Sequence, residues 1–453
     1  MNKGFSPGKI VIFSFITGII AGTILLSFPF TFHGKGLPFI DRLFTAVSAI
    51  CVTGLIVVDT GSKFTIPGQL IILVLIQMGG LGLMTFSTTF ALIIKRKMSV
   101  KEKLIIREGL NKYGLSDTRR VIWYIIIFTF IMEILGALLL YLRWDNVFPT
   151  PHRRLYLSLF HSISAFCNAG FSLFSNSLER FAFDPVTVLV ITSLIIVGGL
   201  GFFVNYEIKN FIARKFTFIR KLFKLRSFSI HMSLHTKIVL STSLVLIVFG
   251  VVMLNLLDIN QLMRDKGVEN RLLIGYFQSV TARTAGFNTI TIRDLTNSSW
   301  VILIVLMFIG GSPGSTAGGI KTTTMATLFL TLKSMFRGRD NVEAYNRTLP
   351  KIIIRKTIVI FTMGLGLILT AFVIIMAIEQ KKFLSLPVLF EITSAFGTVG
   401  LSTGITSSLS PLSKLVLIVL MFVGRIGPLT IAISMVEKEK YLIKYPDEKI
   451  SVG

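Results

Sequence analysis

The chain has 453 residues, of which 52% are hydrophobic and 15% charged, and its mean hydropathy is +0.76. It carries 47 Lys and Arg against 22 Asp and Glu, a formal net charge of +25. So apolar a composition excludes a disordered chain and argues against an ordinary soluble enzyme. The basic excess indicates nucleic-acid binding in a soluble protein, but in a membrane protein it marks the loops that stay in the cytoplasm.

Eight stretches are apolar and long enough to cross a hydrocarbon core of about 30 Å, which needs about 20 residues of helix. They cover residues 10–30, 64–94, 121–142, 185–204, 238–257, 295–320, 357–378 and 415–436. Six contain no charge, while the third contains Glu133 and the eighth contains Arg425. The sequence therefore predicts an all-α integral membrane protein with eight transmembrane helices.

The connectors between these spans alternate in charge. Residues 95–120, 205–237 and 321–356 hold nine, eight and eight Lys or Arg against three, one and two acidic residues. The other connectors, 31–63, 143–184, 258–294 and 379–414, together hold 15 Lys or Arg and 11 acidic residues. The positive-inside rule places the first set in the cytoplasm, and eight spans then leave both termini there. We expect a multi-pass protein of the plasma membrane.

The four outside connectors share one pattern. Each has an aromatic residue followed ten positions later by a glycine, and these glycines, Gly54, Gly170, Gly286 and Gly400, are spaced by 116, 116 and 114 residues. The segment between aromatic and glycine is too short to cross the membrane. The chain is therefore predicted to contain four pseudo-symmetric repeats of helix, re-entrant pore helix, glycine turn and helix. Their expected limits are 1–115, 116–232, 233–350 and 351–436, followed by a cytoplasmic tail, 437–453.

Four glycine turns around one axis favour an ion pore. Irregular backbone at membrane depth is tolerated only where it is buried in protein or lines water. Glycine permits a backbone that points carbonyl oxygens inward, and rings of carbonyls can replace the hydration shell of a cation. The C-terminal ends of the short helices add negative charge, which favours cations. For the later glycine clusters at 79–82, 198–201, 311–314 and 424–427, tight helix packing is an equally good explanation.

These motifs resemble the Ktr/Trk/HKT superfamily of potassium transporters, and within it the KtrB-like membrane subunits, over nearly the whole chain. The resemblance is carried by Val-Thr-Gly54-Leu, Asn-Ala-Gly170-Phe, Thr-Ala-Gly286-Phe-Asn and Phe-Gly-Thr-Val-Gly400-Leu, with Phe422-Val-Gly-Arg425-Ile-Gly and Tyr445-Pro-Asp. It implies four outer helix–pore loop–inner helix units around a central pore, with potassium bound by the backbone carbonyls of a selectivity filter. The filter residues that it implies are Val52, Thr53, Gly54, Asn168, Ala169, Gly170, Thr284, Ala285, Gly286, Thr398, Val399 and Gly400.

The third inner span contains a run that an uninterrupted helix would not hold, because Gly costs about 1 kcal/mol and Pro about 3 kcal/mol in a helix interior. The run is Gly310, Gly311, Ser312, Pro313, Gly314, Ser315, Thr316, Ala317, Gly318 and Gly319. We expect a movable constriction here, and the resemblance implies an intramembrane gating loop with Arg425 facing the pore beside it. The alternative role for Arg425 is a structural pin that bonds exposed carbonyl groups of the broken helix. A phosphate-binding loop is excluded, because Lys321 stands one place too late and no strand precedes the run.

The expected cargo is K+, with no cofactor in this chain, and the alternative function is sodium-coupled potassium symport on the same fold. The resemblance implies a homodimer in membrane lipid, docked on a cytosolic nucleotide-binding regulatory ring. The available docking surfaces are 95–120, 205–237, 321–356 and 437–453. An enzyme is excluded, since the chain lacks paired catalytic carboxylates, a nucleophile elbow and a metal cluster. His231 and His235 have i,i+4 spacing, but they lack further ligands nearby.

Other candidate side chains have structural interpretations. Cys51 and Cys167 each stand three residues before a filter glycine, where a small buried residue supports the loop. Glu133 is expected to pair with a neighbouring helix, because a charge inside the membrane needs a partner. Arg283 and Glu391 are expected to form a salt bridge that braces the filter.

Overall fold

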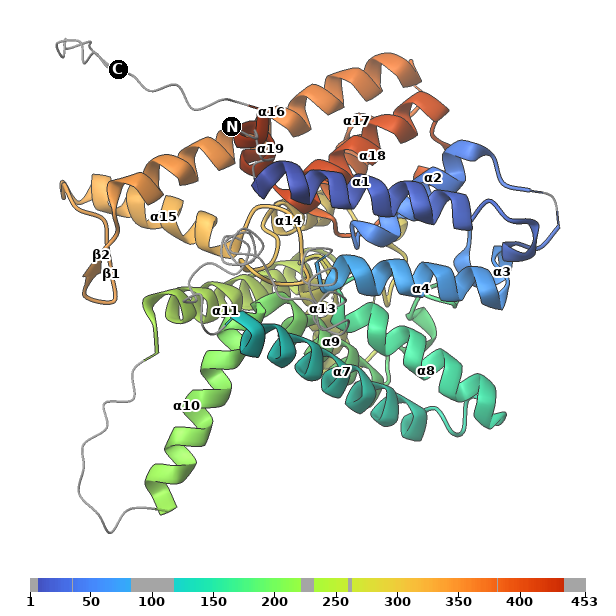
Figure 1. Ribbon diagram of the computed structural model, residues 1–453, viewed down its shortest axis with the longest axis horizontal. Coiled ribbons are helices and arrows are strands. Elements are labelled where there is room, and N and C mark those ends of the chain that lie inside the picture. Colours follow the sequence, from blue (N-terminus) through green and yellow to red (C-terminus); the bar gives the residue numbers. More distant parts are fainter. Residues whose placement is uncertain are drawn as a thin grey trace.

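The computed structural model describes residues 7–34, 36–82, 118–220, 232–259, 263–380 and 382–435, and these are mostly helical, as predicted. Three kinds of helix recur four times along the chain (Figure 1). The outer helices are α1 (Pro7–Leu25), α7 (Thr118–Arg143), α11 (Leu234–Leu254) and α16 (Lys351–Glu379). The pore helices are α2 (Phe39–Ile50), α8 (Pro151–Phe166), α13 (Val268–Thr281) and α17 (Ser385–Gly397). The inner helices are α4 (Ile66–Gly80), α9 (Pro185–Leu200), α14 (Asn297–Phe308) and α18 (Pro411–Ile426).

Further elements connect or follow these helices. They are α3 (Thr60–Lys63), α10 (Phe202–Arg220), α15 (Thr322–Phe336) and α19 (Pro428–Met435), with short helical turns at Pro29–Thr31, Glu179–Phe181, Asn255–Ile259, Ile292–Asp294 and Thr406–Ser408. An antiparallel hairpin, β1 (Glu343–Ala344) and β2 (Arg347–Thr348), was not predicted; Ala344 pairs with Arg347 across its turn. In Figure 1, α10 projects away from the bundle.

Each inner helix begins at a polar cap. Thr65, Asp184, Thr296 and Ser410 each accept a hydrogen bond from a backbone N–H in the first turn. Such caps satisfy N–H groups that have no partner inside the helix. In α4, α9 and α18 a proline also occupies the first turn, where its missing N–H costs nothing. The sequence therefore fixes where the chain turns from each outside connector into the inner helix.

The repeats close into a ring. Each inner helix packs on the pore helix of the next repeat, α4 on α8, α9 on α13 and α14 on α17, and α18 packs back on α2. A buried ion pair joins the last repeat to the first, with 2.8 Å between Lys414 Nζ on α18 and Asp41 Oδ1 on α2. Near two of the expected repeat limits, α11 begins after Ser233, whose side chain caps it, and α16 begins after Pro350. The boundary at 115–116 and the tail 437–453 lie outside the described residues. The limits of the repeats stay a prediction.

The inner helices are shorter than predicted. We expected uninterrupted spans at 185–204 and 415–436, but α9 meets α10 at 103° and α18 ends at Ile426. These two expectations are wrong because Gly201 and Gly427, with φ of 93° and 94°, end the helices in a conformation that glycine favours. Among the described residues, three helices are by themselves long and apolar enough to cross a membrane, and the bent pair α9–α10 would make a fourth. The three are Ile122–Arg143, Leu234–Ile259 and Lys351–Glu379.

Candidate functional site

The four glycine turns adopt the same backbone conformation. Gly54, Gly170, Gly286 and Gly400 have φ of 84°, 69°, 77° and 95°. The residues two places earlier, Val52, Asn168, Thr284 and Thr398, are also left-handed, with φ of 55°, 58°, 73° and 50°. Left-handed backbone is uncommon outside glycine and persists only where the surrounding contacts enforce it. Its repetition at four equivalent places marks these turns as a candidate functional element.

The turns lie next to one another in a closed ring. A Cβ on Gly54 would stand 3.0 Å from the Cα of Gly170, and one on Gly170 would stand 3.0 Å from the Cα of Gly286. The same distance is 3.1 Å from Gly286 to Gly400 and 3.0 Å from Gly400 back to Gly54. Each Cβ would also meet the carbonyl oxygen just before the neighbouring glycine, on Ala169, Ala285, Val399 or Thr53. Only glycine fits, and the structure brings the twelve sequence-predicted filter residues together in this ring.

Hydroxyl groups on the pore helices anchor the turns. Ser48, Ser164 and Thr281 donate hydrogen bonds of 2.7, 2.8 and 2.6 Å to the carbonyl oxygen of the residue after each glycine. In the fourth repeat the direction is reversed, since Gly400 N donates to Ser394 Oγ at 3.1 Å. We did not predict these anchors, although the abundance of Ser and Thr before each glycine was their signal. They explain how an irregular turn keeps its shape at the end of a helix.

The electrostatics of the ring favour cations. Each pore helix ends within a few residues of its glycine, so its negative C-terminal end lies beside the ring. In the same ring, Thr53 Oγ1 and Thr398 Oγ1 are buried without a hydrogen-bond partner among the described residues. Buried polar groups are nearly always paired in native proteins, so each exception needs an explanation.

The glycine-rich run 310–319 forms a loop inside the bundle. Its ends are held together, because Gly310 N donates to Ile320 O at 2.8 Å and Thr322 N donates to Gly311 O at 3.1 Å. Two neighbouring inner helices also hold the loop. Ser312 N donates to the carbonyl of residue 199 on α9 at 3.0 Å, and the N–H of residue 319, at the end of the loop, donates to the carbonyl of residue 424 on α18 at 3.2 Å. A Cβ on Gly318 would strike the side chain of Thr398. The loop therefore borders the fourth filter turn.

Two cations hold the carbonyl groups of this loop. Arg425 on α18 donates to Thr316 O in the loop and to Gly79 O on α4, so it ties the loop to the first repeat. Lys321 donates from Nζ to Ala317 O at 2.8 Å and to Gly318 O at 3.5 Å, both within the loop. The sequence pointed to Arg425, because it is the cation inside an apolar span. It did not point to Lys321, which stands just outside the span among the basic residues of a connector.

The other predicted side chains take structural places. Glu133 on α7 accepts a hydrogen bond of 3.2 Å from Gln77 Nε2 on α4, which agrees with the predicted pairing to a neighbouring helix. Cys167 Sγ lies 3.8 Å from Glu133 Oε1 and 3.5 Å from Gln77 Oε1. Cys51 is also a buried free thiol. Among the described residues there is no metal-binding cluster of three or more side chains, and His231 lies outside them.

The expected salt bridge between Arg283 and Glu391 does not form. Arg283 donates to Ser243 O at 3.4 Å and to Ser243 Oγ at 3.2 Å on the outer helix α11. Glu391 is instead fully engaged by hydroxyl and backbone donors of its own repeat, from Ser402 to Thr406. The prediction is wrong because proximity to the filter in sequence does not decide to which side of a pore helix a long side chain turns.

Comparisons with known proteins agree with this architecture. The family model TrkH, described as a cation transport protein, matches residues 9–443. The chain is 37% identical to the Ktr system potassium uptake protein B of Bacillus subtilis, over 99% of this chain and 97% of that protein. It is 35% identical to the potassium/sodium uptake protein NtpJ of Enterococcus hirae, over 100% of this chain and 98% of that protein. The crystal structure of the potassium transporter TrkH from Vibrio parahaemolyticus superposes with a TM-score of 0.70 at 18% identity, covering 96% of this chain and 86% of that one.

Proposed function

The chain belongs to the TrkH family of cation transport proteins, and we propose that its ring of glycine turns is the filter through which it takes up potassium. It is a membrane transport subunit for K+, not an enzyme, in keeping with relatives of 37% identity along the full chain. One observation carries the assignment of the filter. The four glycines touch in a closed ring that admits no side chain, so backbone carbonyls are the groups left to meet a passing ion.

The chemistry of the ring suits a dehydrated monovalent cation. Carbonyl oxygens replace water around the ion, and the four pore-helix ends add negative potential without introducing a fixed carboxylate. The hydroxyls of Thr53 and Thr398 are buried without a hydrogen-bond partner among the described residues, and the Thr398 side chain lies against Gly318 of the loop. We assign ion binding to the twelve residues of the four turns, from Val52–Gly54 to Thr398–Gly400.

The loop 310–319 is proposed as the gate, and Arg425 is proposed to hold it in the closed position. Arg425 joins the loop to α4, and an intramembrane guanidinium also opposes a cation in the pore. Opening requires the loop to leave Arg425 and the carbonyl groups of α9 and α18. Each such buried hydrogen bond contributes about 1 kcal/mol, so a regulator with a differential affinity of a few kcal/mol suffices to move the loop.

The relatives are named as parts of Ktr systems, so this subunit works within a multi-component system. We propose that it forms a homodimer in the plasma membrane, with both termini in the cytoplasm. A cytosolic nucleotide-binding regulatory ring would bind the basic connectors and the tail 437–453. Sodium-coupled symport remains the second candidate, because the relative from Enterococcus hirae is named as a potassium/sodium uptake protein.

Rubidium uptake in cells that lack potassium transport tests the filter. Gly54→Ser, Gly170→Ser, Gly286→Ser and Gly400→Ser are each expected to reduce uptake or its preference for Rb+ over Na+, because each places a side chain against a neighbouring carbonyl. Unchanged uptake and preference in all four variants would contradict the assignment. Dependence of wild-type uptake on external Na+ would favour the symport alternative.

A further inference from the structure

A buried carboxylate holds the segment that follows the fourth glycine turn. Glu391 stands on α17, nine residues before the glycine, and is 1% exposed. Its Oε1 accepts hydrogen bonds from Ser402 Oγ at 2.7 Å and Thr403 N at 2.8 Å, and its Oε2 accepts one from Thr406 Oγ1 at 2.6 Å. Ser402 Oγ itself accepts one from Gly404 N at 2.9 Å. The carboxylate therefore fixes both the hydroxyls and the backbone just after the turn.

The second repeat has the same arrangement with a different side chain. His161, also nine residues before its glycine, is buried, and its Nε2 lies 3.1 Å from Ser172 Oγ. Its Nδ1 lies 2.8 Å from Leu157 O, and because a carbonyl only accepts, Nδ1 donates and Nε2 of the neutral ring accepts from Ser172. As in the fourth repeat, the serine accepts from the backbone N–H two residues later, here that of Phe174 at 3.0 Å.

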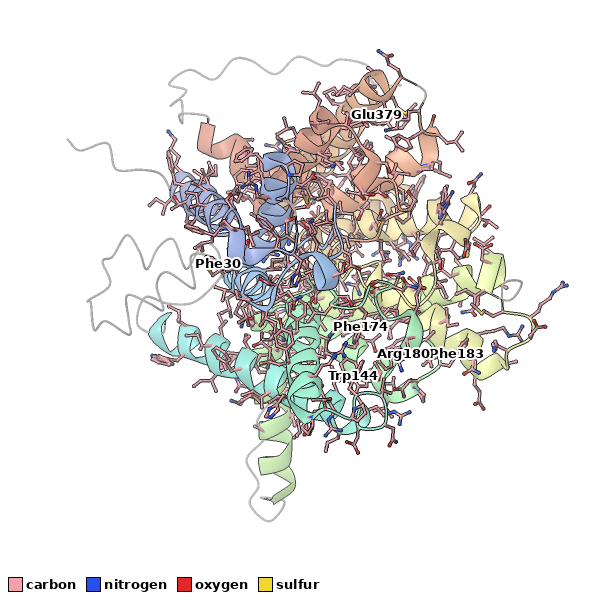
Figure 2. The ribbon with its side chains drawn as sticks, turned by 90° about the vertical axis from the view of Figure 1, so that its right-hand side faces the viewer. Phe30, Trp144, Phe174, Arg180, Phe183 and Glu379 are labelled. Atoms are coloured by element: carbon pink, nitrogen blue, oxygen red, sulfur yellow. The ribbon has the colours of Figure 1, made fainter. Side chains whose placement is uncertain are left out.

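Aromatic rings hold His161 in place. Phe174 stacks on it with 4.5 Å between the ring centroids, and Trp144 meets it edge-on at 5.6 Å. Figure 2 shows Phe174 and Trp144 close together, and their centroids are 5.8 Å apart. An imidazole packed between two rings keeps one orientation, which suits a residue that positions a loop.

The first and third repeats lack this arrangement. At the position of His161 and Glu391, the first repeat has Thr45 and the third has Phe277. Thr45 donates its hydroxyl hydrogen bond to the carbonyl of residue 41 on its own helix. At the position of the serines they have Ile56 and Asn288. Since the ring runs from the first repeat to the fourth in order, the two repeats with the arrangement face each other across the axis.

On the basis of the potassium transport proposed above, we infer that Glu391–Ser402 and His161–Ser172 are bracing pairs that set the ion preference of the filter. Neither pair belongs to the twelve ion-binding residues, and each acts through the turn it holds. A ring of carbonyl groups discriminates against Na+, which is smaller than K+, only if the carbonyls cannot close around it. Stiff turns therefore strengthen the preference for K+. Two opposite turns are braced on both sides, by the hydroxyl anchor and by the bracing pair. The first turn has the anchor alone, and the third is held from outside its repeat, where Asn288 Nδ2 donates to Glu179 Oε1 at 3.2 Å and Asn288 N donates to Ser177 Oγ at 3.2 Å.

The loop-side serines allow a test with small changes. Ser172→Ala and Ser402→Ala remove one hydroxyl each, and Thr45→Val is the matched control, because the hydroxyl it removes bonds only within α2. Rubidium uptake is measured in cells without potassium transport, with Na+ as competitor. Each serine variant should raise the KM for Rb+ and strengthen Na+ competition at least about threefold, because each hydroxyl makes at least two hydrogen bonds that the variant loses. Vmax per folded protein should change less, and Thr45→Val should match the wild type.

Substitutions of Glu391 provide a second test. Glu391→Leu should lose the preference for Rb+ more strongly than Ser402→Ala, while Glu391→Gln should recover most of it, because an amide oxygen still accepts from Ser402 and Thr403. Equal KM and equal Na+ competition in Ser172→Ala, Ser402→Ala and Thr45→Val would overturn the inference, as would failure of Gln to rescue. Absence of uptake by the wild type itself would instead contradict the proposed transport, so the two failures are distinguishable.

Discussion

Two regions of the molecule differ in symmetry: the ring of glycine turns, and the C-terminal ends of the inner helices. In the ring, four turns share one backbone conformation and four equivalent contacts. At the breaks, α9 and α18 end at single glycines, while α14 is followed by a loop of more than ten residues held by two cations. A spherical ion needs equivalent ligands on all sides, whereas a gate needs one element that can move. This difference supports the proposal that the symmetric part binds the ion and the asymmetric part controls its passage.

The largest expected effect on Rb+ uptake comes from adding a methyl group to a glycine of the ring. A glycine outside the ring serves as the control for backbone strain. Gly170 and Gly338 have similar φ, 69° and 62°, but a Cβ on Gly170 meets the carbonyl of Ala285 while one on Gly338 meets nothing within 4 Å. Strain and overpacking together cost about 3 kcal/mol, so Gly170→Ala should lower Rb+ uptake roughly a hundredfold. Gly338→Ala bears the strain alone, away from the ring, and should stay near wild type in the same uptake assay. Equal effects of the two changes would count against the ring.

Shortening the loop tests the asymmetric part. Deletion of Pro313–Ala317 removes the segment that Arg425 holds and should raise Rb+ flux in proteoliposomes roughly tenfold, the effect of about 1.4 kcal/mol on the closed state. Size-exclusion chromatography in detergent checks that the variant is folded. Unchanged or lower flux in well-folded protein would mean that the loop does not obstruct the pathway.

The two cations should differ in their effect on flux. Arg425→Ala breaks contacts between the loop and α4, so flux should rise about fivefold while assembly is retained, the effect of about 1 kcal/mol on the closed state. Lys321→Met loses only contacts within the loop and should change flux less. A larger effect at Lys321 than at Arg425, measured in the same proteoliposomes, would reverse these roles.

The smallest effect on transport is expected at Glu133. Glu133→Gln keeps a side chain of the same shape beside Gln77 and Cys167, and Glu133 makes no hydrogen bond to any of the twelve turn residues. Uptake per folded protein should change less than about twofold, while the free energy of unfolding should fall by an amount on the order of 1 kcal/mol. A strong loss of Rb+ uptake with normal stability would show that this carboxyl takes part in transport.

The sequence predicted the ring of glycine turns better than the breaks at the ends of α9 and α18. Glycines at intervals of 116, 116 and 114 residues located all four turns, because only glycine can approach a neighbouring backbone so closely. The breaks at Gly201 and Gly427 were not predicted, because glycines inside an apolar span are equally typical of tight helix packing.

Contacts between side chains were harder to predict. The pairing of Glu133 with a neighbouring helix followed from the cost of a charge in the membrane. The expected partner of Glu391 was wrong, and the Ser402 contact was not predicted, because it depends on how the chain folds back after the turn. The contact of Lys321 with the loop was not predicted for a similar reason, since the bend that brings its ammonium group onto the loop carbonyls is not visible in the pattern of charges.

Direct location of the ion is the most decisive measurement. Crystals of the protein grown in Rb+ or Tl+ should show an anomalous difference peak on the axis of the ring, within carbonyl coordination distance of all four glycine turns. The peak should be lost in Gly170→Ala and retained in Gly338→Ala. A wild-type ring without a peak at saturating Tl+, in a protein that transports Tl+ in proteoliposomes, would contradict the assignment of the filter.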